Sequence, residues 1–220
     1  MTAGRTILDS REQTLKYDLV EMHRLVSLAL DKALRSIRDF NVDIAAQVIA
    51  EDSQINLLQH KIENNCTTTI ALQQPVASDL RNLLSDIFIS MELERIADHA
   101  AAIAKIVLKF VAAPDSVYAQ PVLEMGEKCK TMLDAVMQAY DETDESLARK
   151  AADMDDAVDE AEREFDDFML REICSESAHK IDCTYLLWIA HNLERIGDRA
   201  TNIAERVAYI TTSETPDLNH

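Results

Sequence analysis

Two stretches of the chain decide the fold: ISMELERIADHAAAIA at residues 89–104 and IAHNLERIGDRATNIA at residues 189–204. Nine of the sixteen positions are identical, at 89, 93–96, 98, 100, 103 and 104 of the first stretch. Similarity at a fixed spacing is the signature of a repeated structural unit. The chain is therefore predicted to contain the same unit twice.

The repeat continues upstream of both stretches without a gap. At an offset of 103 residues it pairs Met22 with Met125, Asp31 with Asp134, Ala45 with Ala148 and Asp52 with Asp155. In the quoted stretches the offset is 100, so a loop is slightly shorter in the second copy. Between the copies, Pro114 ends one helix and Asp115 or Ser116 can cap the next. We predict two domains, residues 1–113 and residues 114–220.

Each copy reads as three long helices. The chain has only 3 Gly and 4 Pro, the residues that helix interiors exclude. Apolar residues recur every three or four positions, and Ser10 with Gln13 forms a possible capping box for the first helix. The predicted helices cover residues 10–39, 42–72, 75–111, 116–141, 145–172 and 178–210. The expected fold is all-α, with two tandem homologous three-helix bundles packed end to end or side by side.

The charge excludes several classes of partner. The net charge is −18, and phosphate backbones repel such a chain, so we expect no nucleic-acid partner. No run of about 18 apolar residues is present, so we expect no membrane insertion and at most peripheral membrane contact. The first residues lack the apolar core of a signal peptide, which predicts a cytoplasmic protein. Four scattered cysteines indicate reduced thiols.

Paired acids in the third helix of each copy suggest metal sites. Glu94 and Asp98 are four residues apart, so they face the same way, nearly opposite the apolar seam of the helix. The second copy repeats them as Glu194 and Asp198 and adds His191 one turn earlier. Such a set suits Fe, Mn or Zn. The alternative is a solvated acidic surface.

The two copies differ at two matching positions close to the acid pair. Glu205 follows the acid pair of the second copy by two turns, where the first copy has Lys105. Met91 stands in the first copy where His191 stands in the second. We therefore expect the first metal site to be the poorer one, because Lys105 can itself neutralise the acids.

A second carboxylate lies in the apolar stripe of the middle helix of each copy. Asp52 and Asp155 occupy equivalent positions there. A carboxylate in such a stripe needs a partner, because burying it unpaired is costly. A metal ion would serve, and so would an ion pair with Arg95 or Arg195. Both alternatives stay open at this point.

Catalytic machinery is not recognisable in the sequence. The chain has no Gly-rich phosphate loop, no H-E-x-x-H motif and no nucleophile elbow. One E-x-x-H motif, Glu176 to His179, is present, whereas di-iron bundles need two. We therefore do not expect an enzyme. The competing interpretations are a helical-bundle metalloenzyme, either an oxidase or a hydrolase, and an adaptor for a different transporter.

The sequence resembles the PhoU family of phosphate-signalling proteins over nearly its whole length. The motifs that carry the resemblance are QQPVASDLR at residues 73–81, LERIADHAAAIA at 93–104 and LERIGDRATNIA at 193–204. The resemblance implies two tandem three-helix bundles that bind metal ions, including iron clusters in some members. It implies metal ligands at Glu94, Asp98, Glu194 and Asp198, with Asp52 and Asp155 contributing. Fe, Mn, Zn and Mg all remain possible metals.

The resemblance also implies a function. Family members repress the phosphate-starvation response at a phosphate ABC transporter, whose ATPase would be one partner, and at a sensor histidine kinase. Many members are dimers, so a homodimer is expected. The second copy departs from the family pattern, because it reads SESAHKI at residues 175–181 and places His179 where Asp79 stands in the first copy.

Overall fold

The computed structural model describes residues 3–174, 180–214 and 216–218. These residues form helices and their connections. The helices are α1 (Ala3–Arg38), α2 (Val42–Gln73), α3 (Ser78–Val107), α4 (Ser116–Glu142), α5 (Glu145–Ala152), α6 (Asp155–Cys174) and α7 (Lys180–Thr212). The E-x-x-H motif from Glu176 to His179 lies outside the described residues.

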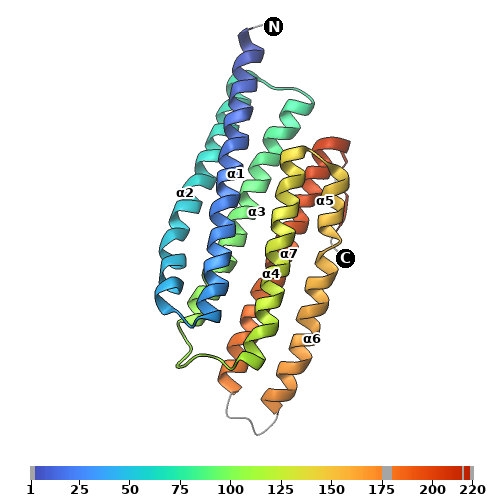
Figure 1. Ribbon diagram of the computed structural model, residues 1–220. Helices are drawn as coiled ribbons and strands as arrows, with labels where there is room; N and C mark the ends of the chain where they lie inside the picture. Colours follow the sequence, from blue (N-terminus) through green and yellow to red (C-terminus); the bar gives the residue numbers. More distant parts are fainter. Residues whose placement is uncertain (1–2, 175–179, 215, 219–220) are drawn as a thin grey trace.

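The helices form two three-helix bundles that lie side by side (Figure 1). Helices α1, α2 and α3 make the first bundle, and α4, α7 and the consecutive α5 and α6 make the second. The tandem-bundle prediction is confirmed. Buried residues of both bundles belong to one continuous hydrophobic core, so the two copies stabilise one another.

Helices α3 and α7 run antiparallel at the centre of the molecule (Figure 1). Two equivalent contacts join them. Glu92 of α3 accepts a weak hydrogen bond from Arg199 of α7 at 3.5 Å, and the Nδ1 of His99 lies 3.0 Å from the Oδ1 of Asn192. Because residues 92 and 192 match in the repeat, as do 99 and 199, each contact is the copy of the other. The bundles are therefore related by a pseudo-twofold axis that passes between α3 and α7.

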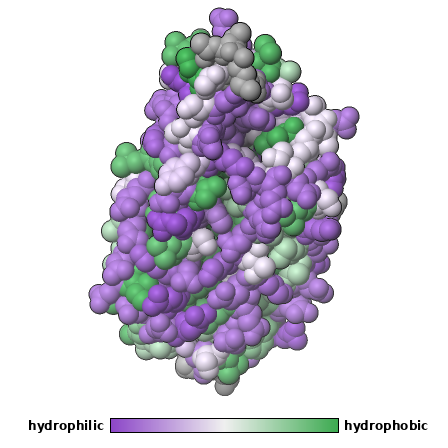
Figure 2. Space-filling view, turned by 45° about the horizontal axis from the view of Figure 1, so that its top comes forward, coloured by the Kyte–Doolittle hydropathy of each residue, from purple (hydrophilic) through white to green (hydrophobic). Residues whose placement is uncertain are grey.

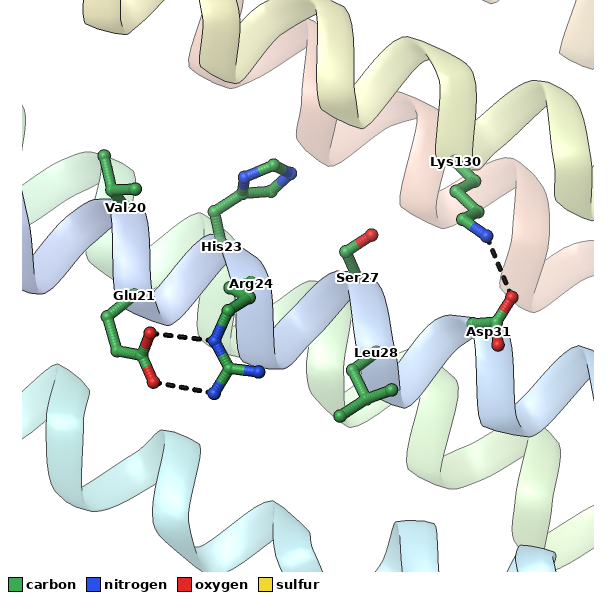
Figure 3. A pocket seen from close by; sticks show the side chains of 8 residues that line it. All are labelled: Val20, Glu21, His23, Arg24, Ser27, Leu28, Asp31 and Lys130. Carbon is green, nitrogen blue, oxygen red and sulfur yellow. Dashed lines mark hydrogen bonds and ion pairs between the residues drawn. The ribbon is translucent and has the colours of Figure 1, made fainter.

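Helices α1 and α4 also contact each other, through two ion pairs. Lys130 of α4 bonds Asp31 of α1 at 2.8 Å, and His23 of α1 pairs with Asp134 of α4 at 2.9 Å. Asp31 and Asp134 match in the repeat. A shallow hollow lies over this part of α1 (Figure 3), where Glu21 and Arg24 pair through two hydrogen bonds and Asp31 meets Lys130. The two carboxylates that line this hollow are thus each paired with a cation that lines it too.

Several helix ends differ from the prediction. Ser10 lies inside α1 rather than capping it, because the helix already begins at Ala3. Helix α3 begins at Ser78 instead of Pro75, since Gln74 and Ala77 have positive φ angles of 48° and 49° and interrupt the helical path. It also ends at Val107, short of residue 111. The expected cap at Asp115 is confirmed, because its side chain accepts a hydrogen bond from the Val117 amide.

The middle helix of the second bundle is broken, contrary to the single helix predicted at 145–172. Helix α5 ends at Ala152 and α6 begins at Asp155. The Met154 amide donates to the Ala151 carbonyl, a tightened turn of the 3₁₀ type. The break places Asp155 in the first turn of α6, where the positive end of the helix dipole favours a carboxylate.

None of the described helices is both long enough and apolar enough to cross a membrane. On the face drawn in Figure 2, hydrophilic side chains predominate and hydrophobic ones form small separate groups.

The buried carboxyl group of Asp86 also links the two bundles. Asp86 of α3 is 6% exposed and accepts a 2.7 Å hydrogen bond from the Tyr140 hydroxyl of α4. Burial raises the pKa of Asp86 to about 7; the charge of Glu12 also raises it, while Tyr140 and Lys16 lower it. The matching positions in the repeat hold Leu186 and Ile37, so this contact occurs at one end of the molecule.

The raised pKa of Asp86 predicts a pH-dependent stability. The native state binds this proton more tightly than the unfolded chain does, so the stabilisation is present at acid pH and is lost as the pH rises towards about 7. We expect Asp86→Asn to flatten the decline of stability between pH 5 and pH 7.5, as measured by urea unfolding. Parallel pH profiles for the variant and the unsubstituted protein would contradict this expectation.

Candidate metal centres

The first acidic cluster lies between α2 and α3. The pKa of Asp52 is raised by burial and by the negative charge of Asp98, and the pKa of Glu94 is raised by burial, Asp98 and Asp52. These shared effects show that the three predicted acids of this bundle lie together. A cation among them would remove the repulsion.

Two buried oxygen atoms without a hydrogen-bond partner, which we call orphan atoms, lie in the same cluster. The Oδ1 of Asp52 and the Oδ1 of Asn56 are buried and have no hydrogen-bond partner. Asn56 donates only a long 3.4 Å bond to the other oxygen of Asp52. Buried oxygen atoms without a donor suit a hard cation, because they are otherwise costly.

Lys105 of α3 affects the first cluster electrostatically. Its positive charge lowers the pKa of Asp52, which opposes the effect of burial. The ammonium group thus supplies part of the charge that a metal ion would supply. The first site is accordingly the weaker candidate.

The second cluster lies between α6 and α7 and is richer in ligands. The Nδ1 of His191 is 3.4 Å from a carboxylate oxygen of Glu162 and 3.6 Å from one of Glu194. One ligand atom from each of these three residues lies within 4.8 Å of the others. A set of one imidazole and two carboxylates suits Fe, Mn or Zn.

Further carboxylates of α6 extend the second cluster. Burial and the charge of Asp198 raise the pKa of Asp159, and burial raises that of Asp166, while the charge of His191 lowers it. Asp155, Asp159, Glu162 and Asp166 are spaced four, three and four residues apart. They therefore form one acidic face of α6, and this face is turned towards α7.

Two carboxyl groups of the second cluster are strongly perturbed. Burial raises the pKa of Glu194 to about 7, and the charges of Asp198 and Glu162 add to the effect. Burial likewise raises the pKa of Asp155 to about 6, although the Thr201 hydroxyl donates a 2.9 Å hydrogen bond to it. One oxygen of each group, Oε2 of Glu194 and Oδ1 of Asp155, is buried without a hydrogen-bond partner. These orphan atoms fit a bound cation.

The alternative of ion pairs to Asp52 and Asp155 is wrong for the two arginines considered. Arg95 pairs with Glu92 at 2.8 Å, and Arg195 pairs with Asp198 at 2.7 Å. Each arginine reaches a carboxylate three residues away on its own helix, which is closer than the neighbouring helix. Asp198 is therefore shared between an arginine and the acidic cluster.

The structure places all seven predicted site residues in the two clusters and adds three. Asp52, Glu94 and Asp98 meet in the first, and Asp155, His191, Glu194 and Asp198 in the second. Asp159, Glu162 and Asp166 were not predicted, although their regular spacing with Asp155 is visible in the sequence. Glu205 of α7 instead accepts a hydrogen bond from the Leu218 amide.

Gly197 has no side chain and so leaves room for the Asp155 carboxylate in the second cluster. A Cβ atom at this position would overlap the Oδ1 of Asp155. We expect Gly197→Ala to displace the carboxylate and to weaken metal binding at the second site by about tenfold, the effect of a misplaced ligand. Competition with a chromophoric chelator measures this. The control is Ala97→Gly at the matching position of α3, which is expected to leave affinity at the second site unchanged. Equal affinity of Gly197→Ala and the unsubstituted protein would contradict the prediction.

Comparison with known proteins assigns the fold to a family. A family model described as the PhoU domain matches the chain twice, at residues 19–107 and 122–207. The chain belongs to the PhoU family. Each match spans one bundle's predicted acids, so the two clusters occupy equivalent places in two PhoU domains.

Full-length relatives extend the comparison. A phosphate-specific transport system accessory protein PhoU homolog from Clostridium acetobutylicum is 32% identical over 217 residues, 98% of this chain and 99% of that protein. The PhoU homolog of Zymomonas mobilis is 36% identical over 197 residues, covering 89% and 83%. The crystal structure of the phosphate transport system regulatory protein PhoU from Streptococcus pneumoniae matches with a TM-score of 0.89 at 28% identity, covering 96% of this chain and 99% of that one.

Proposed function

We propose that this PhoU-family protein regulates phosphate uptake and represses the phosphate-starvation response when phosphate is plentiful. The supporting observation is the similarity, over almost the full length of both chains, to a protein named as an accessory of the phosphate-specific transport system. The role is regulatory rather than catalytic. In this proposal the protein acts in the cytoplasm as a homodimer, and each chain consists of two domains, residues 1–113 and residues 114–220.

The proposed mechanism is that of a metal-binding adaptor between the ATPase of a phosphate ABC transporter and a sensor histidine kinase. The two acidic clusters support metal binding, because each brings together carboxylates whose mutual repulsion a cation relieves. A bound ion would supply positive charge and hold α2 to α3 and α6 to α7. The second cluster, with His191, is the tighter site in this proposal.

Deletion of the gene tests the function. We expect high phosphatase activity from a phosphate-starvation reporter in phosphate-rich medium, and repression again when the unsubstituted gene is restored. Activity as low as in the parent strain would remove the phosphate role and favour an adaptor for a different transporter.

Complementation with site variants tests the metal part separately. Glu194→Ala with Asp198→Ala is expected to lose metal and to restore no repression. The matched control is Glu160→Ala with Glu164→Ala, because these exposed acids are also four residues apart but lie outside the cluster. A Glu194 and Asp198 variant that keeps both metal content and repression would exclude the second cluster from the mechanism.

A further inference from the structure

A row of cations follows the contact between α3 and α7, where the two helices lie side by side, and we call it the basic seam. It consists of Arg95 of α3, of Lys109 just beyond the end of α3, and of Arg195, Arg199 and Arg206 of α7. The chain as a whole has 40 acidic residues against 22 lysines and arginines. A local excess of cations on such a protein is unexpected if charges are simply spread over a solvated surface.

The carboxylates that contact the seam do not balance it. Glu92 is 1% exposed and is held by Arg95 at 2.8 Å and by Arg199 at 3.5 Å. Asp198 pairs with Arg195. Burial lowers the pKa of the neighbouring His99; the charges of Arg199 and Arg195 also lower it, while the hydrogen bond with Asn192 and the charge of Asp98 raise it. At the centre of the seam, three guanidinium groups are thus bonded to only two carboxylates.

Aromatic rings occupy both ends of the seam at matching positions of the repeat. The guanidinium of Arg206 lies 3.9 Å from the centroid of the Phe88 ring, and the ammonium of Lys109 lies 5.2 Å from that of Trp188. Trp188 is 49% exposed. Arginine and tryptophan are the residues most enriched in the hot spots of protein interfaces.

The basic seam is also accessible. The side chains of Arg95 and Arg195 are 46% and 41% exposed, so their guanidinium groups can reach a partner. From Phe88 to its last residue, Val107, α3 advances about 28 Å, since each helical residue adds about 1.5 Å. A helix of about 20 residues would cover this length.

We propose that the basic seam binds an acidic, amphipathic helical segment of a partner protein. Carboxylates of that segment would pair with Arg95 and Arg195, and its apolar side chains would pack on Trp188 and Phe88. This inference goes beyond the adaptor role, because it assigns the partner surface and the chemistry of the segment that fits it.

The position of the seam couples it to the metal centres. It runs along α3 and α7, which also carry Glu94 and Asp98 on one side and Glu194 and Asp198 on the other. Unliganded acidic clusters repel an acidic segment, whereas bound cations neutralise them. Metal loading should therefore strengthen the binding of the partner segment, a consequence that rests on the proposed metal sites.

Trp188 is the only tryptophan of the chain, so its fluorescence reports directly on the seam. The probe is a synthetic 20-residue helix of glutamate and leucine that contains no tryptophan. We expect it to bind at low ionic strength, to change the Trp188 emission, and to bind more weakly as salt is added. Titration with Mn²⁺ present is expected to tighten binding.

Charge-removing variants locate the binding. Arg95→Gln with Arg195→Gln is expected to weaken peptide binding at least tenfold, and Lys109→Gln, which touches no acidic cluster residue, to weaken it about threefold. The matched control is Arg24→Gln on α1, because Arg24 also pairs with a glutamate three residues earlier, Glu21. Circular dichroism checks that all variants keep their helices.

Two outcomes would overturn the proposal. The first is the absence of peptide binding by the unsubstituted protein at low salt; seam-dependent binding of phosphatidylglycerol vesicles in that case would make the seam a membrane surface. The second is equal weakening of peptide binding by Arg24→Gln. These results do not depend on the deletion test, so the proposed phosphate role and the proposed binding surface can be contradicted independently of each other.

Discussion

Glu162→Gln combined with Glu194→Gln is expected to remove the stabilisation that metal ions give this protein. A metal at one hundred times its dissociation constant stabilises a folded protein by about 2.7 kcal/mol. For a chain of this size that corresponds to a rise in melting temperature of about 5–10 °C. The double variant loses two of the three ligands that meet around His191, so the rise should vanish for the second site.

The same variant should be at least as stable as the unsubstituted protein when no metal is present. Burial, Asp198 and Glu162 all raise the pKa of Glu194, so the charged form is disfavoured in the folded state. Near neutral pH a glutamine of the same shape removes this repulsion. Opposite changes with and without metal distinguish a ligand from a residue that only supports the fold.

Thermal unfolding with and without Mn²⁺ or Zn²⁺ provides the measurement. Glu160→Gln with Glu164→Gln is the control, and it should keep the full metal-induced rise. Glu94→Gln in the first bundle should remove a smaller rise, because Lys105 already opposes the acids there. A double variant with an undiminished rise would show that the metal binds elsewhere.

Glu92→Ala is expected to cause the largest loss of stability. The Glu92 carboxylate is buried at the centre of the molecule and contacts Arg95, Arg199 and Asn202. Removing one partner of a buried ion pair costs about 3–5 kcal/mol, because the other charge is left uncompensated. Arg95 is half-exposed and contributes less, so we expect about 3 kcal/mol and a fall in melting temperature of about 6–12 °C.

The matching position of the other copy supplies the control for Glu92. Asn192→Ala removes the neutral hydrogen bond to His99, which is worth about 1 kcal/mol. Urea unfolding of both variants gives the comparison. If the two substitutions cost the same, Glu92 does not act as a buried counter-ion and the polar contact between the bundles is merely a solvated one.

The repeat and the helix periodicity predict most of the fold, because long helices that contain few glycines and prolines leave little choice of architecture. The break between α5 and α6 could not be predicted. Ala148, Ala151 and Val158 continue the apolar spacing through it, and no glycine or proline marks it. The early start of α1 was missed because Ser10 looks like a cap in isolation, although Ile7 and Leu8 continue the helix upstream.

The candidate sites were only partly predictable. A helical wheel places Glu94 with Asp98 and Glu194 with Asp198, but it cannot say which acids of another helix lie opposite. That depends on how α6 packs against α7, which brings Glu162 to His191. The arginine alternatives failed for a related reason: a long side chain reaches a carboxylate of its own helix before it reaches a neighbouring helix.

The crosswise contacts between α3 and α7 have an evolutionary consequence. A half-length chain of three helices, carrying Glu92 and His99 on one helix, could meet a second identical chain in this geometry and form a twofold dimer. Once two such chains are joined end to end, the two halves can evolve different sequences. One half can then acquire His191 and Glu162 while the other acquires Lys105. The fused chain thereby holds two unlike ion sites at a fixed separation, which a dimer of identical halves cannot do.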